Sequence, residues 1–197
     1  NRKTTIDTAS QGIRRFCVGL GKKVLIANHM AVIADAAFNL IFGGQFHSTV
    51  AMAWLGAIAY ALQIYFDFSG YSDMAIGLGK IVGFRFLENF DYPYTATSVT
   101  DFWRRWHISL STWFRDYLYF PLGGSRRGTV RTYLNILVIY LVSGIWHGAG
   151  WTFIFWGLLH GLAQVAERLL GKRLDCIPKA VRWVLTFAFV NVAWVFF

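Results

Sequence analysis

Long apolar runs constrain this chain more than any other feature of its sequence. The clearest cover residues 50–66, 133–146, 151–166 and 183–197, and weaker candidates cover residues 13–30 and 72–84. Hydrophobic residues make up 56% of the chain and charged residues only 15%, which lies on the membrane side of the averages for soluble domains. Since a bilayer admits only segments that satisfy their own backbone polar groups, the runs predict membrane helices.

One membrane domain is expected over residues 1–197, because no repeat, low-complexity stretch or proline-rich linker divides the sequence. The chain begins at Asn1 instead of a methionine and ends within an apolar run, so we expect the central part of a longer multi-pass protein. Cys17 and Cys176 are too few and too far apart to predict a disulfide framework. The expected fold class is therefore all-α, as a fragment of a polytopic membrane protein.

The net charge of +9 is carried by residues that lie beside the apolar runs. They form two groups, Arg104, Arg105, Arg115, Arg126, Arg127 and Arg131, and then Arg168, Lys172, Arg173, Lys179 and Arg182. This placement fits the positive-inside rule better than a nucleic acid-binding stripe, so no nucleic acid partner is expected. If residues 133–166 form a hairpin, both of its basic flanks should lie on the cytoplasmic side.

His147 lies at the turn of that hairpin, between Trp146 and Gly148. The apolar run before it rises about 21 Å at about 1.5 Å per residue, which is less than the roughly 30 Å of a bilayer core. An ionisable group at that depth is costly and is a functional-site candidate by default. A core histidine bonded to a backbone carbonyl is the competing interpretation, but Gly148 and Gly150 allow the backbone to break or a ligand to approach.

His107 is the second candidate, within a helix expected over residues 98–118. Ser98 and Asp101 stand at capping-box spacing, which marks a helix start. The helix would present one wide apolar face made of Phe102, Trp103, Trp106, Leu110, Trp113, Phe114, Tyr117 and Leu118. It would lie along the membrane interface or enter the protein as a half-helix. His107 borders this face, so it either meets His147 in a cavity or stays partly in water.

The remaining histidines give weaker signals. His160, four residues after Trp156 in an apolar run, is interpreted mainly as a packing or hydrogen-bonding residue, and His29 and His47 receive no role. No histidine pair has the short helical spacing of a zinc site, so no catalytic metal is expected.

Asp67 and Asp73 form a polar patch after the first strong apolar run. The two carboxylates would serve general acid and base chemistry. The more ordinary interpretation is that they pair with Arg104, Arg105 or Arg115, or that they cap the next helix. The arginines themselves would hold an anionic donor or lipid headgroup, or only set topology.

Three motifs, in order along nearly the whole chain, resemble those of the membrane-bound O-acyltransferase (MBOAT) family. They are YFDFSGYSD at residues 65–73, DFWRRWHISLSTWFRDYLYFPLGG at residues 101–124 and WHG at residues 146–148. The chain looks most like the branch that acetylates exopolysaccharides such as alginate. The resemblance implies a helical bundle with tilted, broken and interfacial helices around a channel, in the bacterial inner membrane.

The resemblance also implies an activity and a site. It implies that acetyl groups pass from a cytoplasmic thioester, such as acetyl-CoA, to a periplasmic acetyltransferase partner within the polysaccharide export machinery, with no bound cofactor. It makes His147 the catalytic base and matches His107 to a position held by His or Asn among members. The expected substrate contacts are Trp146, Trp103, Arg104, Arg105 and Asp73.

Alternatives remain open from the sequence. Transfer of D-alanine to teichoic acid occurs in the same family. A non-enzymatic carrier also uses broken helices and buried histidines. A structural assembly subunit is a third interpretation, and under it a His147→Ala protein would still support acetylation.

Overall fold

The computed structural model describes residues 4–42 and 49–197, and His47 lies outside them. Over these residues every regular element is a helix, which confirms the all-α fold class. The chain separates into two compact units, unit 1 (Asn1–Asn89) and unit 2 (Phe90–Phe197). The expectation of a single domain over residues 1–197 stays a prediction.

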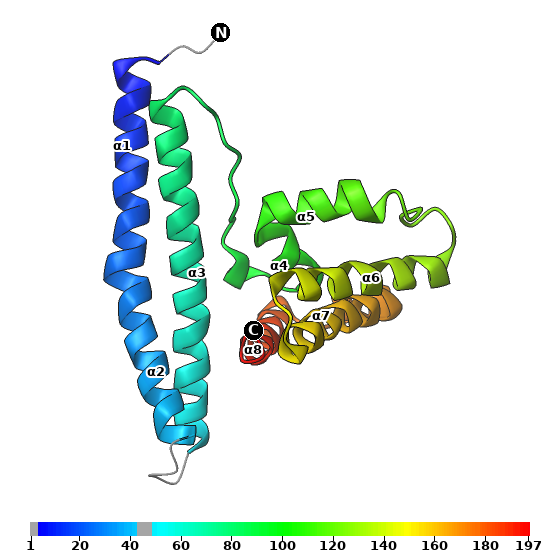
Figure 1. The fold of residues 1–197 in the computed structure, drawn as a ribbon. Helices are drawn as coiled ribbons and strands as arrows, with labels where there is room; N and C mark the ends of the chain where they lie inside the picture. The colour runs from blue at the N-terminus through cyan, green and yellow to red at the C-terminus, as the bar shows by residue number, and fades with distance from the viewer. Residues whose placement is uncertain (1–3, 43–48) are drawn as a thin grey trace. The chain divides into compact units, whose positions relative to one another are not determined.

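Unit 1 consists of two long antiparallel helical segments. The first joins α1 (Ile6–Gly21), a π-helical turn (Lys22–Ala27) and α2 (Asn28–Phe42), and it runs beside α3 (Val50–Ile81) (Figure 1). The sequence predicts that residues 50–66 and 72–84 are separate segments, but they form one helix as far as Ile81. The polar patch does not interrupt this helix, because its carboxylates find cationic partners on the first segment.

Two pairs of glycines allow α1 and α3 to approach closely. A Cβ atom added to Gly12 would lie 2.6 Å from the carbonyl oxygen of Gly77, and one added to Gly19 would lie 2.5 Å from that of Gly70. Both helices space their glycines seven residues apart, so the same contact repeats two turns later. The backbones therefore pack at a distance that excludes any side chain.

Substitution of Gly19 by alanine should lower the free energy of unfolding by about 1–3 kcal/mol, because the added methyl group overpacks a backbone contact. Thermal unfolding of the full-length protein in detergent micelles measures the change. Gly21→Ala is the matched control, since a Cβ there meets no atom within 4 Å and alanine favours the helix by up to about 1 kcal/mol. Equal melting temperatures for the two variants would contradict the close approach.

Unit 2 contains shorter helices around an aromatic core. They are a 3₁₀ turn (Pro93–Thr95), α4 (Val99–Arg105), α5 (Ile108–Phe114), a π-helix (Arg115–Tyr119), α6 (Thr129–His147), α7 (Trp151–Leu170), a second 3₁₀ segment (Gly171–Cys176) and α8 (Lys179–Trp194). α6 and α7 lie side by side as an antiparallel hairpin (Figure 1). Phe102, Trp106, Trp156 and Trp194 are buried and pack against one another.

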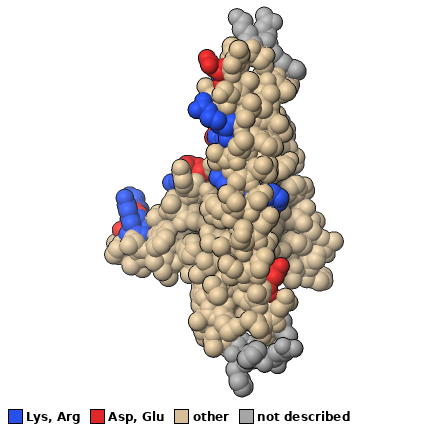
Figure 2. Space-filling model, turned by 90° about the vertical axis from the view of Figure 1, so that its left-hand side faces the viewer, with Lys and Arg blue, Asp and Glu red and all other residues tan. Residues whose placement is uncertain are grey.

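Three helices in the described residues are long and apolar enough to cross a membrane: Ile6–Ile41, Val50–Ile81 and Thr129–His147. Exposed apolar side chains such as Leu25 and Val32 suit a lipid environment, and uncharged residues cover most of the face drawn in Figure 2. The spans predicted at residues 151–166 and 183–197 form α7 and most of α8, but neither is among the three. α7 carries several polar residues, and α8 has only 16 residues.

Candidate functional site

The helix expected over residues 98–118 is broken at His107. α4 ends at Arg105, and His107 adopts a left-handed backbone conformation with φ 46° and ψ 56° before α5 begins. Histidine is among the residue types that tolerate this region. The Ser111 hydroxyl lies 3.1 Å from the carbonyl oxygen of Trp103 and 3.4 Å from that of Trp106, so it supplies a donor to carbonyls next to the break. The expectation of one continuous helix is therefore wrong.

Glu167 on α7 fixes the start of α4. Its carboxylate accepts hydrogen bonds from the backbone N–H groups of Val99 and Thr100, at 2.5 and 2.9 Å, and from the Thr100 hydroxyl at 2.7 Å. Ser98 caps the same helix by accepting from the N–H of Asp101 at 2.9 Å, as its spacing predicts. These bonds hold the first turn of α4 against α7 and so set the direction of the side chains that follow.

His147 ends α6, where the chain breaks at Gly148 and Gly150 before α7 begins, which confirms the predicted break. Its half-buried ring lies among aromatic rings, with centroid distances of 4.8 Å to Trp146, 5.1 Å to Trp156 and 5.0 Å to Phe197. Trp146 remains 60% exposed. One side of the imidazole is thus held by packing, and part of it stays accessible.

His107 and His147 lie within reach of each other's charge. Burial and, second, the electrostatic effect of His147 lower the pKa of His107 to about 4. His107 is therefore neutral near pH 7, and it lies outside the three helices long enough to span a membrane. The structure brings the two candidate histidines into one region, whereas their chemical roles stay predictions.

A cavity of about 460 Å³ opens beside this region. It is lined by Thr100, Trp103, Arg104, Ile108, Leu110, Ser111, Thr112, Phe114, Arg115, Tyr119, Ile136, Ile139, Tyr140, Ser143, Gln164 and Arg168. On α6, Tyr140 and Ser143 share one face with His147, because they are spaced by three and four residues. The cavity face of α6 therefore leads toward His147, although neither His147 nor His107 lines the cavity.

Within the part of the chain that the structure describes, two guanidinium groups at the cavity have no acidic partner. For the side chains of Arg104 and Arg168, no hydrogen bond or ion pair is found within the described part of the chain. Arg115 instead pairs with Asp116, with Nε and Oδ1 2.8 Å apart. Unpaired guanidinium groups at a cavity suit phosphate or carboxylate oxygens.

Arg105, expected to contact substrate, does not line the cavity. It pairs with Asp101 at 3.0 Å and with Asp91 at 3.7 Å. Its substrate contact therefore stays a prediction, and its guanidinium group joins the end of α4 to Asp91 in the preceding segment.

The cavity residues of α7 are Gln164 and Arg168, and the sequence alone does not mark either one as a site residue. Gln164 Nε2 donates to the Tyr140 hydroxyl at 2.5 Å. On α7, Trp156, His160, Gln164 and Arg168 follow one another at intervals of four residues, so they share one face. That spacing is the sequence signal that identifies this face of α7.

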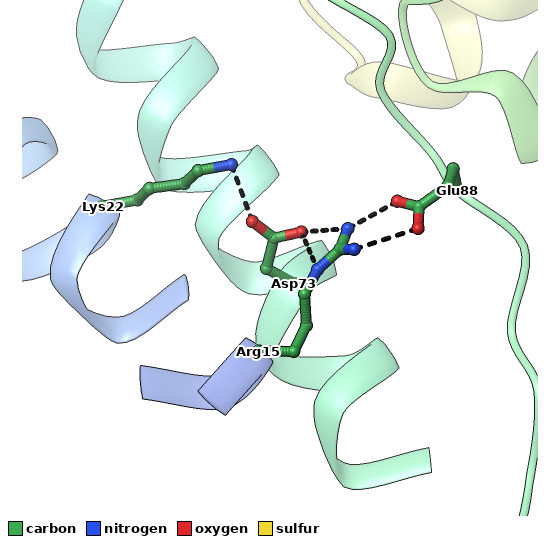
Figure 3. A network of polar contacts seen from close by, with 4 residues as sticks. All are labelled: Arg15, Lys22, Asp73 and Glu88. Atoms are coloured by element: carbon green, nitrogen blue, oxygen red, sulfur yellow. Dashed lines mark hydrogen bonds and ion pairs between the residues drawn. The ribbon is translucent and has the colours of Figure 1, made fainter. Parts of the chain in front are cut away.

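Asp73 lies in unit 1 and is engaged by two cations (Figure 3). Its Oδ1 accepts from Arg15 Nε at 2.7 Å and its Oδ2 from Lys22 at 2.6 Å, while Arg15 also reaches Glu88. Asp67 pairs with Lys23. The patch thus pairs with basic residues, but with those of the first helical segment instead of Arg104, Arg105 or Arg115. A substrate contact for Asp73 stays a prediction.

Over residues 4–42 and 49–197 no three His, Cys, Asp or Glu side chains form a group that could hold a metal ion. The site instead combines half-buried imidazoles with a cationic cavity. Such a combination can move a proton and place an anionic substrate.

Comparison with known proteins gives a consistent result. Residues 5–197 match the model of the MBOAT, membrane-bound O-acyltransferase family. The "Probable alginate O-acetylase AlgI" of Pseudomonas putida is 54% identical over 200 residues, which cover 100% of this chain and 40% of that protein. The peptidoglycan O-acetyltransferase of Helicobacter pylori is 46% identical over 190 residues, 94% of this chain and 35% of its own length.

A more distant relative is the teichoic acid D-alanyltransferase of Bacillus subtilis, 29% identical over 200 residues, which cover 93% of this chain and 49% of that protein. The chain thus spans about two fifths of the length of the first relative, about a third of the second and about half of the third.

Proposed function

Because the chain belongs to the membrane-bound O-acyltransferase family, we propose that its protein is an O-acetyltransferase of the bacterial inner membrane. It passes acetyl groups from a cytoplasmic thioester, such as acetyl-CoA, across the membrane for O-acetylation of an exopolysaccharide such as alginate. The names and identities of the relatives from Pseudomonas putida and Helicobacter pylori support acetyl as the group transferred.

The cavity of unit 2 is the observation that supports this proposal best. Arg168 lies at one end of the α7 face and Trp156, beside His147, lies at the other. Twelve residues separate them, or about 18 Å along the helix at about 1.5 Å per residue. A donor with an anionic part at Arg168 and Arg104 and a thioester on a long flexible arm fits this arrangement.

The sidedness of the hairpin supports a cytoplasmic donor. Arg126, Arg127 and Arg131 lie at or before the start of α6, and Arg168 and Lys172 lie at the end of α7 or beyond it. Since α6 and α7 are antiparallel, both groups lie at the same end of the hairpin, opposite His147. The positive-inside rule assigns that end to the cytoplasm.

The chemistry of the transfer follows from the two imidazoles of His147 and His107. His147 takes the proton from the attacking hydroxyl, whose oxygen bonds to the thioester carbonyl carbon. The tetrahedral intermediate then expels the thiolate, which receives the proton from His147, and the acetyl ester remains on the acceptor. His107, neutral near pH 7, donates a ring N–H toward the developing oxyanion.

Arg104→Ala and Arg168→Ala should each raise the KM for an acetyl thioester donor by about tenfold or more and leave kcat little changed. Each removes a charge-assisted bond to the donor's anionic part, which contributes about 1.5–3 kcal/mol. Steady-state kinetics with the full-length protein measures both constants. Arg126→Ala is the control, because Arg126 is exposed and does not line the cavity. An unchanged KM in both cavity variants would show that the acetyl thioester donor does not bind in this cavity.

Transfer from labelled acetyl-CoA tests the function as a whole. Inside-out membrane vesicles carrying the full-length protein, with its polysaccharide-modifying partner present, receive either labelled acetyl-CoA or labelled D-alanine with its activating system. Label in the polymer from acetyl-CoA alone is the expected result. Label from D-alanine alone would favour the function named for the Bacillus subtilis relative, and uptake of an unaltered labelled thioester would favour a carrier.

A further inference from the structure

His160 is completely buried at the centre of unit 2, inside a group of aromatic rings. Its ring centroid lies 5.0 Å from that of Trp103, 5.2 Å from that of Trp156 and 5.4 Å from that of Phe189. Trp103 Nε1 donates a hydrogen bond to His160 Nδ1 at 3.1 Å. Because an indole nitrogen only donates, Nδ1 carries no proton, and the neutral ring holds its proton on Nε2.

Packing alone does not account for a histidine at this position. The Nε2 atom of His160 is buried, and no hydrogen-bond partner for it is found in the described part of the chain. A buried donor without an acceptor is unfavourable, and a phenylalanine ring would fill similar space without one. The favourable polar contact of this histidine is the bond from Trp103, so its value lies in holding that indole.

The two indoles next to His160 face the two parts of the site. Trp103 lines the cavity, and the Trp156 ring lies 5.1 Å from the ring of His147. The Trp103 and Trp156 rings also contact each other, with centroids 5.6 Å apart. His160 therefore supports the aromatic layer that joins the cavity to the candidate base, without lining the cavity itself.

We propose that His160 is a positioning residue for acyl transfer. By accepting the bond from Trp103 and packing on Trp156, it fixes the wall along which the thioester must approach His147. This inference rests on the proposed function of the cavity and of His147. A shift of about 1 Å in such a wall is enough to cost up to about 10²-fold in rate.

Steady-state kinetics of the full-length protein with acetyl-CoA tests the proposal. His160→Phe keeps an aromatic ring but removes the acceptor, and it should lower kcat by about tenfold or more. The KM for acetyl-CoA should stay within about threefold, because Arg104 and Arg168 still hold the anionic part. His160→Asn places an amide oxygen near the position of Nδ1 and should recover a large part of kcat.

A double variant separates the hydrogen bond from packing. If the bond is what matters, Trp103→Phe with His160→Phe should be no slower than Trp103→Phe alone, since one change already removes the bond. Additive losses, or a wild-type kcat in His160→Phe, would overturn the proposal. So would a His160→Asn protein of normal abundance that is as inactive as His147→Ala, because His160 would then act in the chemistry directly.

His29→Asn, at an exposed position on α2, is the control for replacing a histidine. Membrane abundance and melting temperature are measured for every variant, and a kcat loss in His160→Phe that vanishes after correction for abundance would also overturn the proposal. The two hypotheses fail differently. If the wild-type protein transfers no acetyl group, the proposed function fails; if it does so and His160→Phe is equally fast, only the positioning role fails.

Discussion

Replacement of His147 by alanine should lower the rate of acetyl transfer by about 10²- to 10⁴-fold, the range that general base catalysis contributes. The imidazole lies at the helix break, half-buried and held by the rings of Trp156 and Phe197. Alanine removes the proton acceptor and leaves the backbone break at Gly148 in place. The measurement is transfer of labelled acetyl groups to extracytoplasmic polymer, in cells or vesicles, at matched membrane abundance.

His29→Ala serves as the control for this variant, because His29 is exposed on α2. The control protein should transfer acetyl groups at the wild-type rate. Full transfer by His147→Ala at normal abundance would exclude His147 as the base, and it would favour the assembly-subunit interpretation.

Replacement of His107 by alanine should produce the second largest loss, about 10²- to 10³-fold in kcat, the cost of removing one oxyanion donor. His107→Asn should keep more activity for two reasons. An asparagine amide can donate a hydrogen bond, and asparagine tolerates the left-handed conformation that this residue adopts. Comparison of kcat for the two variants, at equal abundance, measures the difference. Equal losses would assign His107 a role that requires imidazole.

The lowered pKa of His107 predicts that the stability of the folded protein depends on pH. The pKa of His107 is about 4 in the folded protein and about 6.5 in an unfolded chain, so its contribution to stability is complete above about pH 6.5. That contribution is lost as the pH falls through about 4, because the unfolded chain binds the proton more readily. Melting temperatures from pH 7 to pH 4 should therefore fall less steeply for His107→Asn than for the wild type. Parallel curves would contradict the burial of a neutral His107.

Local sequence patterns predicted the helical class and the break after His147. Apolar runs and the Gly148 and Gly150 pair are short-range signals, and each acts within a few residues of the chain. The break at His107 has no such signal, because the apolar spacing continues through it from Trp103 to Leu110. The observed break involves a single left-handed residue next to the Ser111 contacts, which periodicity does not detect.

Long-range partners were the least predictable part of the site. Asp73 pairs with Arg15, which lies 58 positions away in the chain. Nothing in the sequence favours Arg15 over the other arginines as the partner of this carboxylate. The seven-residue spacing of glycines on both α1 and α3 was a usable signal, because two such patterns can face each other. The four-residue spacing from Trp156 to Arg168 was another, and it indicates which face of α7 meets the cavity.

The glycine pairs and the ion pairs of unit 1 together restrict how its helices can move. Arg15, Gly19 and Lys22 lie on one face of the first segment, opposite Gly70 and Asp73. Sliding by one helical turn, about 5.4 Å, would bring side chains between backbones that now touch and would leave the Asp73 carboxylate without its cations. The two long segments of unit 1 therefore have a single register, and a motion of unit 1 that keeps these contacts displaces both segments together.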